Sequence, residues 1–418
     1  MKNIDILIKE NDASLSVLYG ADEAARERIK KAVESFTAIY GEQEYSVFSV
    51  SGRSEISGNH TDHNRGEVLA ASVSLDIIAV AAPTDDGKIY VKSEGFSSHE
   101  VDLGYLDPIE GEEGTSAALI RGVCDGLTKR NRSIGGFCAY MTSSVLGGSG
   151  LSSSAAFEDM IGNIENHLYN DGEIDYIEIS QISQYAENVH FGKPCGLMDQ
   201  IACACGGFVH IDFADPQNPV CEKIELDLAN HGYKLCVVNT GGSHADLTAD
   251  YAAVPAEMKK VAQFFGKEVL RQCTKEDVIA NISALRKYAG DRAVLRALHF
   301  FNENERVKEA SAYLANDDIR GFLSVIKASG ESSAMLLQNY FTPKAPEEQG
   351  ITLACAAANS IIAPEGVCRV HGGGFAGTIQ AFVPEAKLDA FKSVMEASFG
   401  AGAVTVLSIR PVGMTKIF

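Results

Sequence analysis

The 418 residues include no tryptophan and no long apolar run. A membrane-spanning helix needs about 18 or more consecutive apolar residues, and no stretch of the chain approaches that length. The N-terminal segment MKNIDILIKENDAS carries charges where a secretory signal would be apolar. We therefore expect a cytoplasmic protein with no membrane partner.

Basic residues are also scarce, since 36 lysines and arginines face 56 acidic residues and give a net charge of -20. A surface this negative repels phosphate backbones, so we expect no nucleic-acid partner. The ten cysteines form no C-x-x-C pair. They are predicted to be small buried residues in a reducing compartment, a pattern that does not favour a metal or redox centre.

The length of the chain exceeds what one ordinary core accommodates, which predicts two domains. A polar, proline-containing stretch, DFADPQNPVCEKIELDLANHG, ends near residue 230. We place the boundary there, giving an N-terminal domain over 1–230 and a C-terminal domain over 231–418.

Hydrophobic periodicity predicts a mixture of helices and strands. In the first half we expect a helix over 21–41, a strand at EYSVFSV, and strands at LDIIAVAAP and KIYVKSEG joined as a hairpin by the Asp86-Gly87 turn. These strands indicate a mainly antiparallel sheet. Further on we expect a helix from Phe157, a strand over 235–241, helices over 251–340, a strand–turn–strand unit at GVCRVHGGGFAGTIQAFVP and a helix at AKLDAFKSVMEASF.

Residues 51–66 read SGRSEISGNHTDHNRG, and almost none of them suits an apolar core. For an isolated polar run a solvated loop is the usual interpretation. A ligand site is the alternative, because arginine, histidine, aspartate and asparagine supply many hydrogen-bonding groups.

Two glycine-rich turns also allow two interpretations. LGGSGLSSSAAFED precedes an amphipathic helix, where serines cap free N–H groups, but three glycines in four positions also suit close approach of a phosphate. The serine hydroxyls offer an oxygen to Mg²⁺. GGGFAG at 372–377 is either a tight hairpin or a second ligand-binding turn.

Taken in order, GRSEISGNHTDHN, GGSGLSSSAAFE and VHGGGFAG resemble the three motifs of the GHMP small-molecule kinases, and the first resembles the galactokinase signature. AENVHFGKPCGLMDQ at 186–200 resembles the galactokinase segment that carries the catalytic aspartate. The resemblance implies an α+β, two-domain GHMP kinase fold. Its N-terminal domain would resemble domain 2 of ribosomal protein S5, and its C-terminal domain would be ferredoxin-like.

The resemblance also implies ATP-dependent phosphorylation of a sugar at its anomeric hydroxyl, most simply galactose to galactose 1-phosphate. Asp199 would lie beside the C1 hydroxyl as the base, with Arg53 next to it. An arginine close to a carboxylate lowers its pKa, and charge neutralisation accelerates phosphoryl transfer. The implied sugar-binding residues are Asn59, His60, Asp62, Gly196 and Tyr251.

ATP and Mg²⁺ are the implied cofactors. By the same resemblance the ATP phosphates would be held by Gly147, Gly148, Gly150, Ser152 and Ser153, and Gly373 and Gly374 would close over the site. Ser154 and Glu187 match the positions that bind Mg²⁺ in the family.

The match departs from the family at Asn59, where galactokinases carry glutamate. An amide lacks the charge of a carboxylate, so the identity of the sugar stays open. Three alternatives remain: a galactokinase, a kinase for another sugar such as N-acetylgalactosamine, and a non-catalytic protein that senses sugar and ATP. The oligomeric state also stays open, with a monomer among the options.

Overall fold

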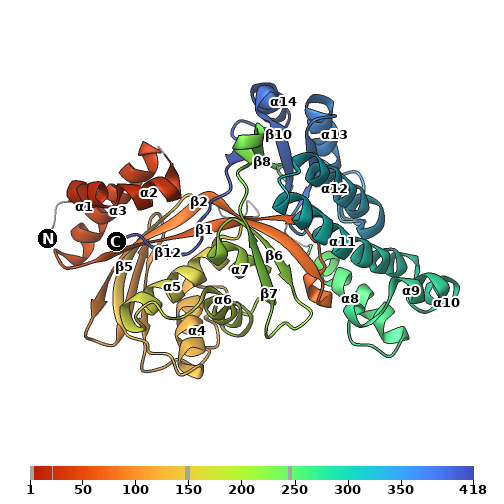
Figure 1. Ribbon diagram of the computed structural model, residues 1–418. Helices are drawn as coiled ribbons and strands as arrows, with labels where there is room; N and C mark the ends of the chain where they lie inside the picture. Colours follow the sequence, from red (N-terminus) through yellow and green to blue (C-terminus); the bar gives the residue numbers. More distant parts are fainter. Residues whose placement is uncertain (1–3, 21, 146–150, 243–246) are drawn as a thin grey trace.

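The computed structural model describes residues 4–20, 22–145, 151–242 and 247–418. Two sheets organise the chain (Figure 1). The first has the order β12-β1-β2-β5-β3-β4, with β6 pairing to β2 and β7 to β6. Its strands are β1 (Ser46–Ser57), β2 (Glu67–Thr84), β3 (Lys88–Ser93), β4 (Ser98–Asp102), β5 (Gly136–Ser143), β6 (Phe208–Asp212), β7 (Val220–Ile224) and β12 (Thr415–Lys416).

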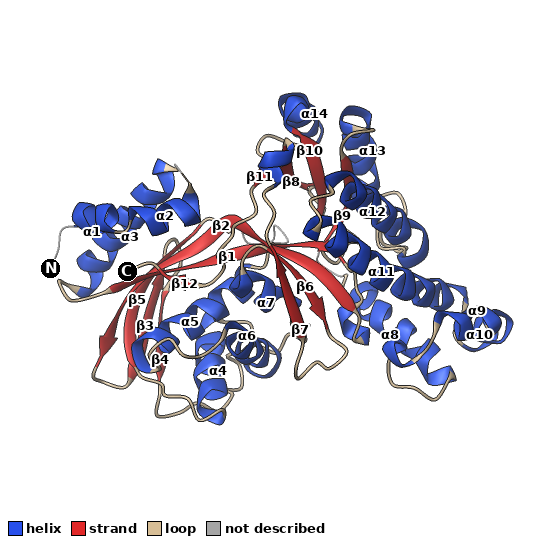
Figure 2. Cartoon of the chain, viewed as in Figure 1, coloured by secondary structure: helices blue, strands red, loops and turns tan. Residues whose placement is uncertain are grey.

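Helices cover both faces of this sheet (Figure 2). On one face lie α1 (Ile4–Glu10), α2 (Asp12–Tyr19) and α3 (Glu23–Tyr40); on the other lie α4 (Ser116–Lys129), α5 (Ser153–Tyr169), α6 (Tyr176–Tyr185) and α7 (Met198–Cys205). Alternate residues of β2 therefore enter different cores. Ile78 and Val80 pack with α3, whereas Ala79 and Ala81 pack with α4 and α5. This explains why the strand reads as a continuous apolar run.

The predicted helix over 21–41 is confirmed. Asp22 caps α3 by accepting a hydrogen bond from the Ala24 N–H at 2.9 Å, and Gly41 ends the helix with a φ of 80°. None of the helices in the described ranges has the length and apolar character needed to cross a membrane.

The predicted hairpin between the strands at LDIIAVAAP and KIYVKSEG is wrong. The chain does reverse at Asp86-Gly87, but β5 lies between β2 and β3. β5 pairs antiparallel with β2 and parallel with β3. The short turn makes the chain reverse direction after β2. It does not decide which strand pairs with β2, because β5, a later strand, occupies the place beside β2. The other pairings of this sheet are antiparallel, as predicted.

The second sheet contains β8 (Tyr233–Asn239), β9 (Val367–His371), β10 (Thr378–Pro384) and β11 (Val404–Leu407) in the order β11-β8-β10-β9, and all its pairs are antiparallel. Helices α13 (Gly350–Ile362) and α14 (Leu388–Phe399) pack on it. The remaining helices are α8 (Thr248–Phe264), α9 (Lys275–Ala280), α10 (Ile282–Tyr288), α11 (Asp291–Ala315) and α12 (Ile319–Ser332). The strands and helices predicted for this half are confirmed.

The C-terminal end of the chain belongs to the first sheet, not to the second. After β11 the chain returns to the first sheet, where β12 pairs with β1 and the Phe418 carbonyl accepts a hydrogen bond from the Val47 N–H at 2.7 Å. The C-terminus consequently lies beside the N-terminal helices (Figure 1). The domain boundary near 230 stays a prediction, although the second sheet does begin shortly after it.

Half of the polar stretch at 51–66 is a buried strand. Residues 51–57 belong to β1 and are buried, because side chains from the second sheet cover them. Arg369 donates to the Ile56 carbonyl at 2.7 Å, and Gln380 donates to the Glu55 carbonyl at 2.7 Å. A solvated loop is therefore excluded for this half, and the strand joins the two sheets.

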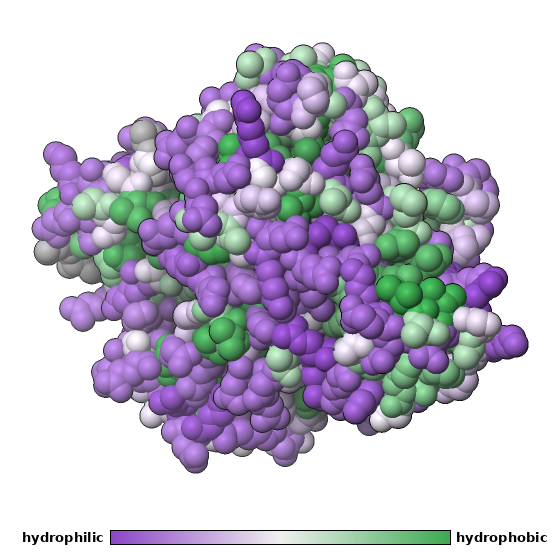
Figure 3. All heavy atoms as spheres, turned by 45° about the vertical axis from the view of Figure 1, so that its right-hand side comes forward, coloured by the Kyte–Doolittle hydropathy of each residue, from purple (hydrophilic) through white to green (hydrophobic). Residues whose placement is uncertain are grey.

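The face of the molecule in Figure 3 is mostly hydrophilic, with apolar side chains gathered in separate patches. The net charge of -20 resides on a surface of this kind, because lysine, glutamate and aspartate are rarely buried without a partner.

Candidate active site

Residues from both halves of the chain line a cavity of about 280 Å³. Its walls come from β1, from the short helix η1 (Asp62–Asn64), from the start of α7 and from the turn between β9 and β10. The polar and glycine residues that line it are Arg53, Glu55, Gly58, His60, Asp62, His63, Lys193, Cys195, Gly196, Asp199, Gly372 and Gly373. Five of the residues predicted for catalysis and sugar binding are thus brought together: Arg53, Asp199, His60, Asp62 and Gly196.

Arg53 and Asp199 form a two-point ion pair. The Nε and Nη2 atoms of Arg53 each donate to one oxygen of Asp199 at 2.8 Å. Arg53 lies on β1 and Asp199 in the first turn of α7, 146 residues later. The planar guanidinium matches both carboxylate oxygens, which sets the orientation of Asp199 in the cavity.

Burial raises the pKa of Asp199, but the charge and hydrogen bonds of Arg53 outweigh it and hold the net pKa below the ordinary carboxyl value. The hydroxyl of Ser152, which donates to the Oδ2 atom of Asp199, acts in the same direction. Asp199 is therefore an anion at neutral pH, and 31% of its side chain is exposed to the cavity.

Ser154 and Glu187 also meet. The Ser154 hydroxyl lies 3.2 Å from the Oε1 atom of Glu187, which is 2% exposed. Lys193 contacts the same oxygen at 2.9 Å, and Gln200 donates to the other at 3.1 Å. Two hard oxygen donors this close are the ligand types that Mg²⁺ prefers.

His60 and Gly196 have local conformations that suit a crowded polar site. His60 has a left-handed backbone, with a φ of 61°, and its Nε2 atom lies 2.9 Å from the Gly373 carbonyl oxygen. Burial lowers the pKa of His60 to about 4, so its ring is neutral at pH 7. A methyl group at Gly196 would overlap the Oδ2 atom of Asp62, so only glycine leaves that carboxylate in place.

Asn59 is fully buried and uses its amide inside the protein. Its Nδ2 atom donates to the Oε1 atom of Glu55 at 2.9 Å and to the Gly372 carbonyl at 2.8 Å. Its Oδ1 atom accepts from Asn339 at 2.7 Å. The structure therefore places Asn59 beside the cavity wall and does not bring it into the lining.

The chain is similar to several known proteins. Residues 34–83 match the family model described as the galactokinase galactose-binding signature, and residues 118–207 match that of the GHMP kinases N terminal domain. A galactokinase of Streptomyces coelicolor is 31% identical over 373 residues, which cover 89% of this chain and 93% of the relative. A galactokinase of Actinobacillus pleuropneumoniae is also 31% identical, over 88% of this chain and 93% of the relative.

The chain belongs to the galactokinase family. The fold predicted for that family is confirmed by solved structures. A Lactococcus lactis galactokinase complexed with galactose superposes with a TM-score of 0.79 at 23% identity, covering 93% of this chain and 99% of that one. A Methanococcus jannaschii mevalonate kinase superposes with a TM-score of 0.61 at 15% identity, and the match covers 88% of this chain and 99% of the mevalonate kinase chain.

Tyr251, predicted to lie against the sugar, contacts the glycine turn. Its hydroxyl donates to the Gly374 carbonyl at 2.9 Å, and its ring packs edge-on against Phe375 at 5.5 Å. The ring also lies so close to Gly373 that a side chain there would overlap it. In this galactokinase-family chain, Tyr251 thus supports the turn that carries Gly372 and Gly373. Its contact with a sugar stays a prediction.

The predicted phosphate-binding residues are only partly described. Gly147, Gly148 and Gly150 lie outside the described residues. Ser152 precedes α5 with a left-handed backbone, and Ser153 and Ser154 are the first residues of that helix. Ser153 and Ser154 line a second cavity of about 340 Å³, whose walls include Phe96, Phe157 and Phe191.

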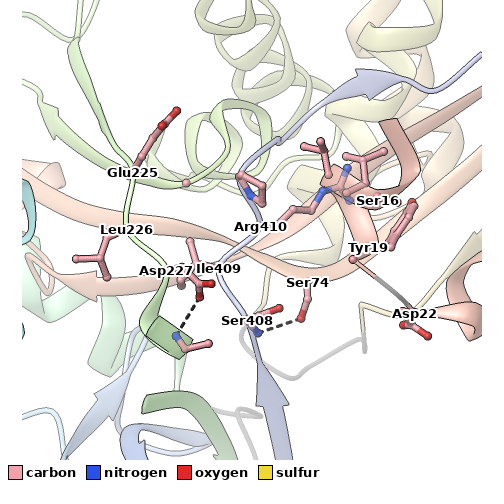
Figure 4. Close-up of a pocket in the computed structure, with 16 residues that line it drawn as sticks. Ser16, Tyr19, Asp22, Ser74, Glu225, Leu226, Asp227, Ser408, Ile409 and Arg410 are labelled. Carbon is pink, nitrogen blue, oxygen red and sulfur yellow. Dashed lines mark hydrogen bonds between the residues drawn. The ribbon is translucent and has the colours of Figure 1, made fainter. Parts of the chain in front are cut away.

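Sequence reasoning missed Glu55 and Lys193, which both line the cavity of about 280 Å³. A signal for Glu55 was present, because Glu55 follows Arg53 by two positions on one strand and so points to the same face. Another cavity, of about 800 Å³, lies where the 408–411 segment runs beside β2 (Figure 4). The Ser408 N–H donates to the Ser74 hydroxyl there at 3.2 Å, and none of the predicted site residues lines it.

Proposed function

We propose that this galactokinase-family chain transfers the γ-phosphoryl group of ATP to the C1 hydroxyl of galactose, giving galactose 1-phosphate and ADP. The observation that carries the proposal is the two-point pair of Arg53 and Asp199 in a polar cavity that also holds Asp62 and His60. A sugar presents several hydroxyls at once, and a cavity with convergent donors and acceptors matches that chemistry.

In the reaction, the C1 hydroxyl oxygen bonds to the γ-phosphorus, the bond to ADP breaks and the hydroxyl loses its proton. Asp199 is positioned to accept that proton. Its depressed pKa makes it a weak base, so its main contribution is to orient the hydroxyl, and the proton moves late, as the new P–O bond forms. Arg53 keeps Asp199 ionised and offsets negative charge that builds on the phosphoryl oxygens.

The first turn of α5 supports a nucleotide site. Ser154 and Glu187 would hold Mg²⁺, which would neutralise charge on the ATP phosphates. Lys193, now paired with Glu187 at 2.9 Å, would be free to approach a phosphate once the cation takes over that carboxylate. We place adenine in the adjoining cavity, where Phe96, Phe157 and Phe191 supply aromatic surface in the absence of tryptophan.

The asparagine at position 59 is the observation that favours a second candidate substrate. The family glutamate is missing at this position, so a kinase for another sugar such as N-acetylgalactosamine is the alternative. A non-catalytic sensor is disfavoured, because Arg53, Asp199 and Glu187 are all present with intact contacts.

The test is ADP release from MgATP with a panel of sugars, comparing the natural chain with Asp199→Asn. We expect turnover on galactose and a fall in kcat of about 10²- to 10⁴-fold in the variant, with galactose binding retained. Asp175→Asn is the matched control. Asp175 caps α6 by accepting from the Glu178 N–H at 2.9 Å, a role that asparagine fills equally well.

Turnover on a different sugar would overturn galactose as the substrate and leave the chemistry in place. Binding of sugar and ATP without turnover of any sugar would overturn the kinase proposal and favour the sensor. Equal losses in Asp199→Asn and Asp175→Asn would show that Asp199 has no specific part in the reaction.

A further inference from the structure

The missing glutamate at position 59 raises the question of which group replaces its charge in the cavity. Asn59 does not do so, because both of its N–H donors are used, by Glu55 and by the Gly372 carbonyl. An amide has two N–H donors, so none remains for a substrate hydroxyl. The only other amide atom, the oxygen Oδ1, accepts from Asn339.

Glu55 is the carboxylate that Asn59 contacts, and it lines the cavity. β1 is regularly paired from Arg53 to Glu55, opposite Ser72 and Ala70 of β2, so the two side chains project from the same face of the strand. Glu55 therefore shares the wall from which Arg53 reaches Asp199.

The carboxylate of Glu55 is held at one oxygen. Asn59 donates to Oε1 at 2.9 Å, and Arg369 contacts the same atom at 3.3 Å. Among the described residues, no hydrogen bond reaches Oε2. The side chain is 6% exposed, and this residual exposure is to the cavity. A carboxylate oxygen that borders the cavity without a protein donor is available to accept a hydrogen bond from a substrate hydroxyl there.

We propose that Glu55 determines sugar specificity by accepting a hydrogen bond from a non-reacting hydroxyl of the substrate through its Oε2 atom. Asn59 and Arg369 position it for this purpose. The inference rests on the proposed sugar-kinase function. It assigns the charge lost at position 59 to a residue four positions earlier, on the same wall of the cavity.

Burial raises the pKa of Glu55 to about 7, and the charges of Arg369 and Arg53 keep it from rising further. Asp62 acts in the opposite direction, and His60 and His63 also line the cavity. An ionised carboxylate accepts a hydroxyl hydrogen bond more strongly than a neutral one. Galactose affinity is therefore expected to increase as the pH rises through about 7.

The experiment compares Glu55→Gln with the natural chain on galactose and on its 2-, 3-, 4- and 6-deoxy derivatives. We expect the variant to raise the KM for galactose by about 10- to 100-fold, as for the loss of a hydrogen bond to a charged group, while kcat changes by only a few-fold. For one of the deoxy sugars, the natural chain should show a higher KM than for galactose, whereas Glu55→Gln should show the same KM for that deoxy sugar and for galactose.

Glu165→Gln is the matched control. Glu165 is also a buried carboxylate with a raised pKa, of about 8, but it lies on α5 and bonds to the Gly135 N–H at 3.1 Å, away from the cavity. It should leave both KM and the deoxy-sugar pattern unchanged. His63→Gln separates any contribution of that histidine to the pH profile.

A KM for galactose in Glu55→Gln equal to that of the natural chain would overturn the inference, and so would equal discrimination of all four deoxy sugars by both proteins. A second measurement needs no variant and remains decisive if Glu55→Gln does not fold. Calorimetric binding of galactose to the natural chain should strengthen as the pH rises through about 7, whereas binding of the one affected deoxy sugar should not. Absence of that difference overturns the role of Glu55, and absence of any sugar binding or turnover overturns the kinase proposal as well.

Discussion

Gly196→Ala is expected to damage sugar binding through Asp62 without unfolding the protein. An alanine Cβ at position 196 would overlap the Oδ2 atom of Asp62 and lie 3.2 Å from its Cγ atom. Ordinary contact between such atoms begins near about 3.5 Å, so the carboxylate has to move by about 1 Å. Gly196 does not have a left-handed backbone, and alanine therefore introduces no backbone strain there.

The expected loss follows from that displacement. Misplacement of a positioning group by about 1 Å costs up to about 100-fold in rate, and loss of a hydrogen bond to a charged group costs about 1.5 to 3 kcal/mol. We expect kcat/KM for galactose to fall by about 30- to 100-fold. The free energy of unfolding should change by less than about 1 kcal/mol, because replacing glycine at a compatible position tends to stabilise the chain and offsets part of the crowding.

Steady-state ADP release and urea denaturation measure the two effects separately. The control is the double-mutant cycle with Asp62→Ala, which removes the group that alanine would displace. In that background Gly196→Ala should cost no more than about two-fold, since neighbouring changes acting through one group do not add. Full additivity of the two changes, or natural kcat/KM in Gly196→Ala alone, would refute the steric argument.

Two further predictions concern the charges around the site. In Arg53→Met, burial would act on Asp199 without the opposing guanidinium, so the pKa of Asp199 should rise. The acid limb of the kcat/KM profile should then move up by about 1 to 3 pH units. Arg65→Met is the control: it removes an exposed partner of Glu268 and should leave the acid limb where it is. The second prediction concerns Glu303, a fully buried carboxylate that accepts hydrogen bonds from the Gly58 N–H at 3.0 Å and from Arg306 at 2.7 Å. In Glu303→Gln this carboxylate is lost, and urea denaturation should show a fall of about 3 kcal/mol in the free energy of unfolding. The charges of Arg306 and His299 outweigh burial and hold the pKa of Glu303 below its ordinary value, so this contribution should persist down to strongly acid pH, where the carboxylate takes up a proton. An equal loss in Glu165→Gln would contradict it.

Local pattern was enough to predict most of the elements. The spacing of Phe157, Met160, Ile161 and Ile164 indicated one apolar face, and α5 buries three of these residues. Gly41 marked the C-terminal end of α3. Such signals are local, because a helix satisfies its backbone hydrogen bonds within a few residues. The order of the motifs likewise indicated the family, since the chemistry of phosphoryl transfer restricts which residue types can serve.

Strand partners and the true roles of some site residues required the tertiary structure. The turn at Asp86-Gly87 is visible in the sequence, but the insertion of β5 between β2 and β3 depends on a segment some fifty residues later. Asn59 and Glu55 stand four positions apart, and only the packing of Arg369, Asn339 and Gly372 decides that one is enclosed while the other faces the cavity. The sequence alone determined which residue types are present for the chemistry. Burial and hydrogen-bond partners, which come from segments more than 200 residues away, decided how those residues are used.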